Sequence, residues 1–186
     1  MTIIERNMFL GANTPDGFVG YFHELAGNWG LKKLVILKGG SGVGKSTFMR
    51  KFAEHFIREG RGKTSDKKRV VYYMYCASDP ASLDGVLIED LGVAIIDGTA
   101  PHMVDPKYPG LVDEIVDLAQ FLDGKKLGLT LEQLQSMQEV RKAEFVRAYG
   151  CLNNARNIHM KVEESYVAAM DWDGVDAKLA EVIKSV

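Results

Sequence analysis

Residues 39–47 (GGSGVGKST) combine closely spaced glycines with a lysine and hydroxyl side chains, a set of groups suited to binding phosphate. Residues 39–46 fit the pattern G-x-x-x-x-G-K-[ST], in which successive backbone N–H groups surround the phosphates of a nucleoside triphosphate. Glycine permits the positive φ angles of such a loop, and the helix that follows it adds partial positive charge. The expected phosphate-binding residues are Gly39, Gly40, Ser41, Gly42, Val43, Gly44, Lys45, Ser46 and Thr47.

The last three residues of this loop have distinct expected roles. Lys45 should bridge the β- and γ-phosphates and stabilise the charge that develops during phosphoryl transfer. Ser46 should place its hydroxyl on Mg²⁺, and Thr47 should hydrogen-bond to the α-phosphate. The guanine-specifying pattern N-K-x-D occurs nowhere in the sequence, which favours ATP over GTP.

Asp97 ends the apolar run GVAIID and is the expected second magnesium ligand, which would complete a Walker B pattern. Without the glycine-rich loop, an apolar strand followed by Asp-Gly is equally typical of an ordinary turn. Gly98 follows directly, so the adjacent glutamate that polarises water in many ATPases is missing. The sequence therefore disfavours an efficient ATP-hydrolysing motor.

Further candidate side chains lie in the segments after two predicted strands. Asp79 and Asp84 are candidates for a second magnesium contact or for the base that orients an attacking oxygen. The alternative for the segment around Asp79 is a structural role, because Ser and Asp commonly start helices and turns. His102 is a candidate phosphate sensor or acid, and the alternative is an ordinary solvated loop histidine.

The elements that must position these residues form a strand–helix–strand succession. Short, β-branched apolar runs predict strands over residues 33–38, 70–76 and 92–97, and apolar spacing predicts an amphipathic helix over residues 46–58. This order implies parallel strand pairing with a right-handed crossover. The expected fold class is α/β, a three-layer P-loop NTPase sandwich with a mostly parallel sheet and the glycine loop at the carboxyl ends of the strands.

Beyond residue 110 the sequence becomes helical in character. We expect helices over residues 111–122, from 131 to about 170, either continuous or broken at Gly150, and over 175–186. The domain prediction is a nucleotide-binding core over 1–110 and a helical insertion, lid or arm over 111–186. The last helix lacks a terminating signal, as expected for a chain cut from a longer one. This region contains three arginines, Arg141, Arg147 and Arg156. They could either bind a phosphoryl acceptor or lie on a solvent-exposed helix face.

Composition indicates in which cellular environment the protein functions. Its 186 residues are 46% hydrophobic and 26% charged, which is enough apolar material for a globular core. A net charge of -2 gives no electrostatic reason to expect nucleic acid or an anionic membrane as a partner. The two cysteines, Cys76 and Cys151, match no disulfide or zinc spacing, and no segment has the length of a bilayer-spanning helix. These features predict a cytoplasmic protein.

Four separate segments carry a family resemblance: residues 9–18 (FLGANTPDGF), 37–47 (LKGGSGVGKST), 76–85 (CASDPASLDG) and 95–110 (IIDGTAPHMVDPKYPG). Together they resemble an uncharacterised bacterial P-loop ATPase family, whose members are described loosely as ATPases or nucleotide kinases. The resemblance implies two tandem P-loop units in one polypeptide, of which this chain would be the first. It also implies that the segment before the glycine loop lines a shared site, with Asn13, Thr14 and Asp16 as its polar residues.

Two functional hypotheses follow from these patterns. The first is an ATP-dependent enzyme, either an ATPase or a small-molecule or nucleotide kinase, that cleaves or transfers the γ-phosphate to an acceptor which the sequence does not identify. The second is a nucleotide-dependent switch with slow turnover that uses its helical arm to bind a partner, a second copy of itself or a second P-loop unit. The missing glutamate after Asp97 agrees with the second hypothesis.

Overall fold

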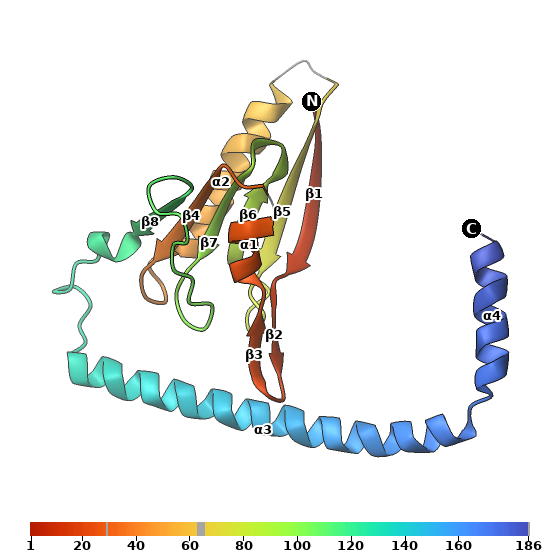
Figure 1. The fold of residues 1–186 in the computed structure, drawn as a ribbon. Coiled ribbons are helices and arrows are strands. Elements are labelled where there is room, and N and C mark those ends of the chain that lie inside the picture. Colours follow the sequence, from red (N-terminus) through yellow and green to blue (C-terminus); the bar gives the residue numbers. More distant parts are fainter. Residues whose placement is uncertain (29, 63–65, 186) are drawn as a thin grey trace. The chain divides into compact units, whose positions relative to one another are not determined.

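The computed structural model describes residues 1–28, 30–62 and 66–185. The chain divides into two compact units, one formed by Met1–Asn13 with Gly17–Met137 and the other by Thr14–Asp16 with Gln138–Val186. The first unit contains a six-stranded sheet, and the second is mainly helical (Figure 1). The chain therefore has an α/β fold with a C-terminal helical segment.

The sheet of the first unit has the strand order β1-β5-β6-β7-β4-β8. Pairing is parallel between β1 and β5, between β7 and β4 and between β4 and β8, whereas β6 is antiparallel to both of its neighbours. The sheet is therefore mostly parallel, as expected, with β6 running against the other strands. The strands are β1 (Thr2–Phe9), β4 (Lys33–Lys38), β5 (Lys68–Tyr75), β6 (Leu83–Ile88), β7 (Val93–Asp97) and β8 (Asp113–Asp117).

Helices cover the two faces of this sheet. Strand side chains alternate between faces, so Leu34 and Ile36 of β4 enter one apolar cluster and Leu37 enters the other. The amphipathic helix α2 (Lys45–Arg61) contributes Met49, Ala53 and Ile57 to the second cluster. The short helix α1 (Phe22–Asn28) covers the opposite face with Phe22 and Leu25 (Figure 1).

Smaller elements connect these layers. A separate two-stranded sheet, β2 (Gly11–Thr14) with β3 (Gly17–Gly20), precedes α1. Two short 3-10 helices follow β6 and β8, η1 (Glu89–Leu91) and η2 (Leu118–Phe121). Both lie where a strand ends, so they turn the chain out of the sheet.

Several predictions of local structure are wrong. The predicted helix over residues 111–122 is instead strand β8 followed by η2, because β8 pairs with β4 at the sheet edge. The strands at 33–38 and 70–76 do not pair with each other, since β6 and β7 lie between them. Strands β1 and β6 were not expected at all. Tertiary pairing overrides local sequence pattern in each of these cases.

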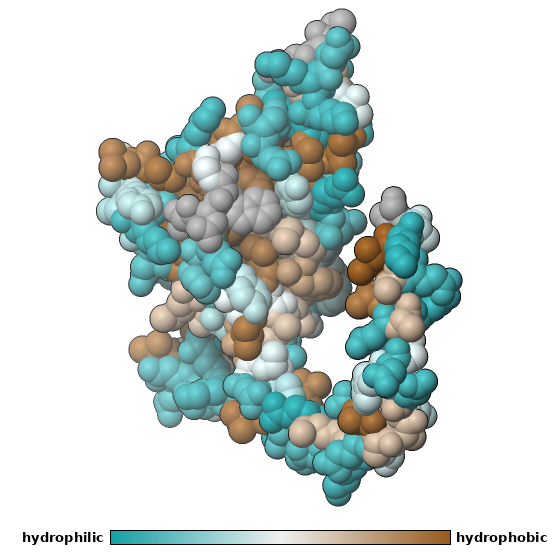
Figure 2. Space-filling view, turned by 45° about the vertical axis from the view of Figure 1, so that its right-hand side comes forward, coloured by the Kyte–Doolittle hydropathy of each residue, from teal (hydrophilic) through white to brown (hydrophobic). Residues whose placement is uncertain are grey.

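The helical segment contains α3 (Leu131–Ala169) and α4 (Trp172–Lys184). Of the two alternatives at Gly150, the continuous helix is correct. The structure describes every residue of α3, and none of them is buried. Figure 2 shows hydrophobic and hydrophilic side chains next to each other on the helical segment. Val186, the last residue of the predicted final helix, lies outside the described residues. Among the described helices, none combines the length and apolarity needed to cross a membrane.

Candidate functional site

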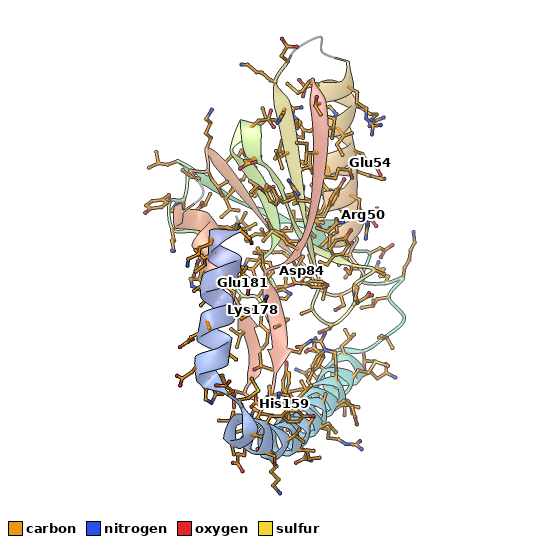
Figure 3. All side chains as sticks on the ribbon, turned by 90° about the vertical axis from the view of Figure 1, so that its right-hand side faces the viewer. Arg50, Glu54, Asp84, His159, Lys178 and Glu181 are labelled. Carbon is orange, nitrogen blue, oxygen red and sulfur yellow. The ribbon has the colours of Figure 1, made fainter. Side chains whose placement is uncertain are left out.

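The carboxyl ends of the parallel strands bring the predicted site residues to one edge of the sheet. Gly39 follows β4, Asp97 ends β7, and Cys76 follows β5. Because β6 runs in the opposite direction, its first residues, including Asp84, reach the same edge (Figure 3). Ligands of open α/β sheets bind at this edge.

The glycine loop leaves an open backbone surface at the start of α2. Gly39 and Gly44 have φ values of 132° and 90°, which residues other than glycine rarely adopt. A Cβ atom at Gly40 or Gly44 would meet no atom within 4 Å, so the space above the loop is open. Helix α2 has no side-chain cap at its N-terminus, and its first backbone hydrogen bond runs from Phe48 N to Gly44 O (2.9 Å). The preceding N–H groups have no acceptor within the helix, and this arrangement fits a phosphate group.

Lys45 and Asp97 are adjacent within this edge. Lys45 Nζ donates to the carbonyls of Gly39 (2.6 Å) and Gly40 (3.0 Å) and lies 3.5 Å from Asp97 Oδ2. The second carboxylate oxygen of Asp97 accepts hydrogen bonds from the backbone N–H (2.8 Å) and the hydroxyl of Thr99. Thr99 therefore holds Asp97 so that its other oxygen faces Lys45.

Ser46 is tied to the antiparallel strand. Its Oγ accepts a hydrogen bond from the backbone N–H of Leu83 at 2.9 Å, at the start of β6. Hydroxyl oxygen has a second lone pair, so this contact leaves capacity for a metal ion. Thr47, the next residue, is exposed to solvent. Ser41 and Val43 lie in the glycine loop between β4 and α2.

Gly98, directly after Asp97, occupies a position with no room for a side chain. A Cβ atom there would lie 2.3 Å from Ile36 Cγ2 and 3.3 Å from Lys38 Nζ. Lys38 Nζ donates to the carbonyls of Gly98 (2.7 Å) and Val104 (3.0 Å). The absence of a glutamate after Asp97 therefore has a packing reason, and Lys38 fixes the loop that follows Asp97. Sequence reasoning missed this role of Lys38, whose position at the strand end was the available signal.

Asp84 and His102 form a buried pair. His102 Nε2 lies 3.0 Å from Asp84 Oδ2, and the two residues are 8% and 5% exposed. The ring of His102 packs between Phe18 and Phe22, with centroid distances of 4.9 and 4.7 Å. His102 is thus not a solvated loop residue, and its pairing with Asp84 was not expected. The nearby Cys76 was also absent from the predicted site.

Asp79 lies in an exposed turn. Its Oδ1 accepts from the backbone N–H of Ala81 (3.1 Å), and its carbonyl accepts from the N–H of Ser82 (2.8 Å). These contacts match the structural alternative that the sequence left open for this residue. Asn13 Nδ2 donates to the carbonyl of Ala77 and to the hydroxyl of Ser78, both at 3.0 Å, and so supports the same segment.

The arginines of the helical segment are exposed. Arg147 pairs with Glu144 at 3.0 Å, and within the second unit Arg156 pairs with Asp16 at 2.7 Å. The hydrogen bond and charge of Arg156 hold the pKa of Asp16 below its usual value. Thr14 belongs to the same unit as Asp16, and Arg141 is solvent-exposed.

No protein-family model, curated protein or solved structure matches this chain. The functional argument therefore depends on the geometry of the sheet edge.

Proposed function

We propose that this chain has a P-loop NTPase fold and binds ATP with Mg²⁺ through residues 39–47. The observation that carries the proposal is the distance of 3.5 Å between Lys45 Nζ and Asp97 Oδ2, next to an uncapped helix N-terminus. The two side chains that the nucleotide pattern requires thus meet in one place, Lys45 from the start of α2 and Asp97 from the end of β7. An ordinary glycine-rich turn gives no reason for this pairing.

Different groups of this site would bind the phosphates and the metal ion. Backbone N–H groups of the loop and of the first turn of α2 would bind the phosphate oxygens, and Lys45 would neutralise their charge. Ser46 and Asp97 would hold Mg²⁺, which neutralises charge on the phosphates when bound. Thr99 positions Asp97 through the hydrogen bonds described above. The proposed reaction is cleavage or transfer of the γ-phosphate to an unidentified acceptor.

Gly98 favours a second candidate function, a nucleotide-dependent switch. A glutamate at this position would clash with Ile36, so a water-polarising carboxylate cannot follow Asp97 directly. Slow hydrolysis is the expected result, and slow hydrolysis suits a protein whose nucleotide state controls an interaction. A kinase should consume ATP quickly only with its acceptor, whereas a switch should turn over slowly with any small molecule.

Thermal unfolding tests nucleotide binding. We expect ATP with Mg²⁺ to raise the midpoint, because a ligand present at 100 times its Kd stabilises the native state by about 2.7 kcal/mol. GTP should have less effect. Lys45→Ala should remove the rise, while Lys51→Ala, at an exposed position of the same helix, should retain it. An unchanged ATP response in Lys45→Ala would refute the assignment.

A further inference from the structure

Three side chains that commonly bind metals meet beside the phosphate-binding edge. Cys76, Asp84 and His102 come from the end of β5, the start of β6 and the loop after β7, and their ligand atoms lie within 4.8 Å of one another. Asp84 and His102 are buried, and Cys76 is partly buried. They are therefore not an exposed cluster of polar groups, which is common without any ligand.

The buried part of this cluster leaves one polar atom without a hydrogen-bond partner among the described residues. Asp84 is a carboxylate at 5% exposure whose described ion-pair partner is His102, and His102 Nδ1 is buried without a hydrogen-bond partner in the described part of the chain. A buried polar atom without a partner is unfavourable. A metal ion bound here would offer the imidazole of His102 a partner.

Cys76 adds a soft sulfur ligand to the two buried side chains. It is partly buried, and its Sγ belongs to the group of ligand atoms that lie within 4.8 Å of one another. A divalent cation bound beside this sulfur would favour its deprotonated form.

We propose that Cys76, Asp84 and His102 form a binding site for a zinc-class divalent metal ion, separate from the Mg²⁺ ligands Ser46 and Asp97. Thiolate and imidazole favour Zn²⁺, Co²⁺ and related ions over Mg²⁺, which prefers oxygen ligands. At metal–ligand distances of about 2.0–2.3 Å, ligand atoms of a tetrahedral site are roughly 3.3–3.8 Å apart. Side-chain movements of about 1 Å bring the present atoms to that spacing.

Three protein ligands leave the fourth position of a tetrahedral ion open, as in catalytic rather than structural zinc sites. His102 also lines a cavity of about 170 Å³, together with aromatic and apolar residues including Phe18, Phe22 and Val104. The cavity has space for water or a small ligand beside the site. Leu83, the neighbour of Asp84, donates to Ser46, so the proposed metal lies one residue from a contact of the phosphate-binding helix.

Cobalt titration tests the site without nucleotide. Purified, reduced, metal-free protein is titrated with Co²⁺, and ultraviolet–visible absorption is recorded. We expect one equivalent to bind with a thiolate-to-metal charge-transfer band, and Zn²⁺ but not excess Mg²⁺ to displace it. Cys76→Ala should abolish the band. Loss of a residue that only hydrogen-bonds to a metal ligand typically weakens metal binding about 10- to 100-fold. Because His102 is proposed as a direct ligand, His102→Ala should weaken Co²⁺ binding by at least that much.

Matched variants make the result specific. Cys151→Ala removes the other, exposed cysteine and should retain the band. Lys45→Ala should also retain it, so loss of nucleotide binding and loss of metal binding are separable. X-ray absorption of the wild-type zinc form, which needs no variant to fold, should show one Zn–S distance of about 2.3 Å. The proposal is overturned by absence of stoichiometric binding, by a band that persists in Cys76→Ala, or by a zinc site without sulfur.

Discussion

Ser46 Oγ accepts the backbone N–H of Leu83 at 2.9 Å and so joins the first turn of α2 to the one strand that runs against the rest of the sheet. The same hydroxyl is the expected magnesium ligand. The side chain therefore has a structural role that exists before any nucleotide binds, and the two roles predict separable effects of mutation.

Ser46→Ala should destabilise the protein even without nucleotide. It leaves the N–H of the buried residue Leu83 without its acceptor, which costs about 1–3 kcal/mol. Urea unfolding of the nucleotide-free protein measures this loss. Ser46→Thr keeps a hydroxyl and should recover most of it, and Thr47→Ala, at an exposed neighbouring position, should change little. Equal stability of Ser46→Ala and wild type would contradict the structural role.

Asp97→Asn should separate nucleotide binding from turnover. The amide oxygen can still accept from Thr99, so the turn is retained while the charge beside Lys45 is lost. We expect ATP turnover to fall roughly 100-fold, the cost typical of removing one preorganised electrostatic partner, with a smaller effect on binding. Phosphate release at varied Mg²⁺ concentration measures the effect. Asp176→Asn, at an exposed position of α4, is the control, and unaltered turnover in Asp97→Asn would reject the proposed magnesium role.

Arg69 should be a major determinant of stability. It is 2% exposed and donates to both carboxylate oxygens of Asp90 (3.0–3.1 Å) and to the carbonyl of Phe56 (2.8 Å). Arg69→Met should cost about 1.5–3 kcal/mol, the range for hydrogen bonds to a charged group, because it removes the contacts to Asp90 and Phe56. Urea unfolding tests this prediction. Lys68→Met, at the exposed position before it in β5, should cost far less, and similar losses in both variants would show that the ion pair is unimportant.

Tyr73 should make stability sensitive to alkaline pH. Burial, followed by the charge of Glu5, raises the pKa of Tyr73 above its usual 10.0. Because the folded state holds this proton more tightly, the contribution is fully present below about pH 10 and is lost as the pH rises through the folded-state pKa. Unfolding free energies measured from pH 8 to 11 should therefore fall less steeply in Tyr73→Phe. Tyr166→Phe, at a position 69% exposed, should keep the wild-type slope.

The parts of the fold that the sequence predicts are those with strong local signals. Strand β4, helix α2 and strand β7 follow from apolar runs and from the glycine pattern between them. Strand β6 (LDGVLI) was missed, because Asp84 and Gly85 are typical turn residues although every residue of the strand is buried. Gly85 has a packing reason, since a Cβ atom there would lie 2.8 Å from Met74 Sδ.

The site was predicted to a similar degree. The approach of Lys45 to Asp97 follows from the parallel arrangement of β4 and β7, which pattern and topology together indicate. The convergence of Cys76 with Asp84 and His102 does not follow from sequence pattern. It depends on the chain reversing after β5 so that β6 starts at the same sheet edge. Cys76, Asp84 and His102 lie in three separate segments, so their contact leaves no local periodicity from which to infer it.

Helix α3 spans 39 residues, none of them buried, which corresponds to a rod of roughly 58 Å at 1.5 Å per residue. Its backbone hydrogen bonds therefore receive no support from a packed core, and amide hydrogens along it should exchange with solvent at a much lower opening free energy than those of β4 or β7. The chain is thus expected to behave as two cooperative folding units, so that heating melts the rod while the sheet persists.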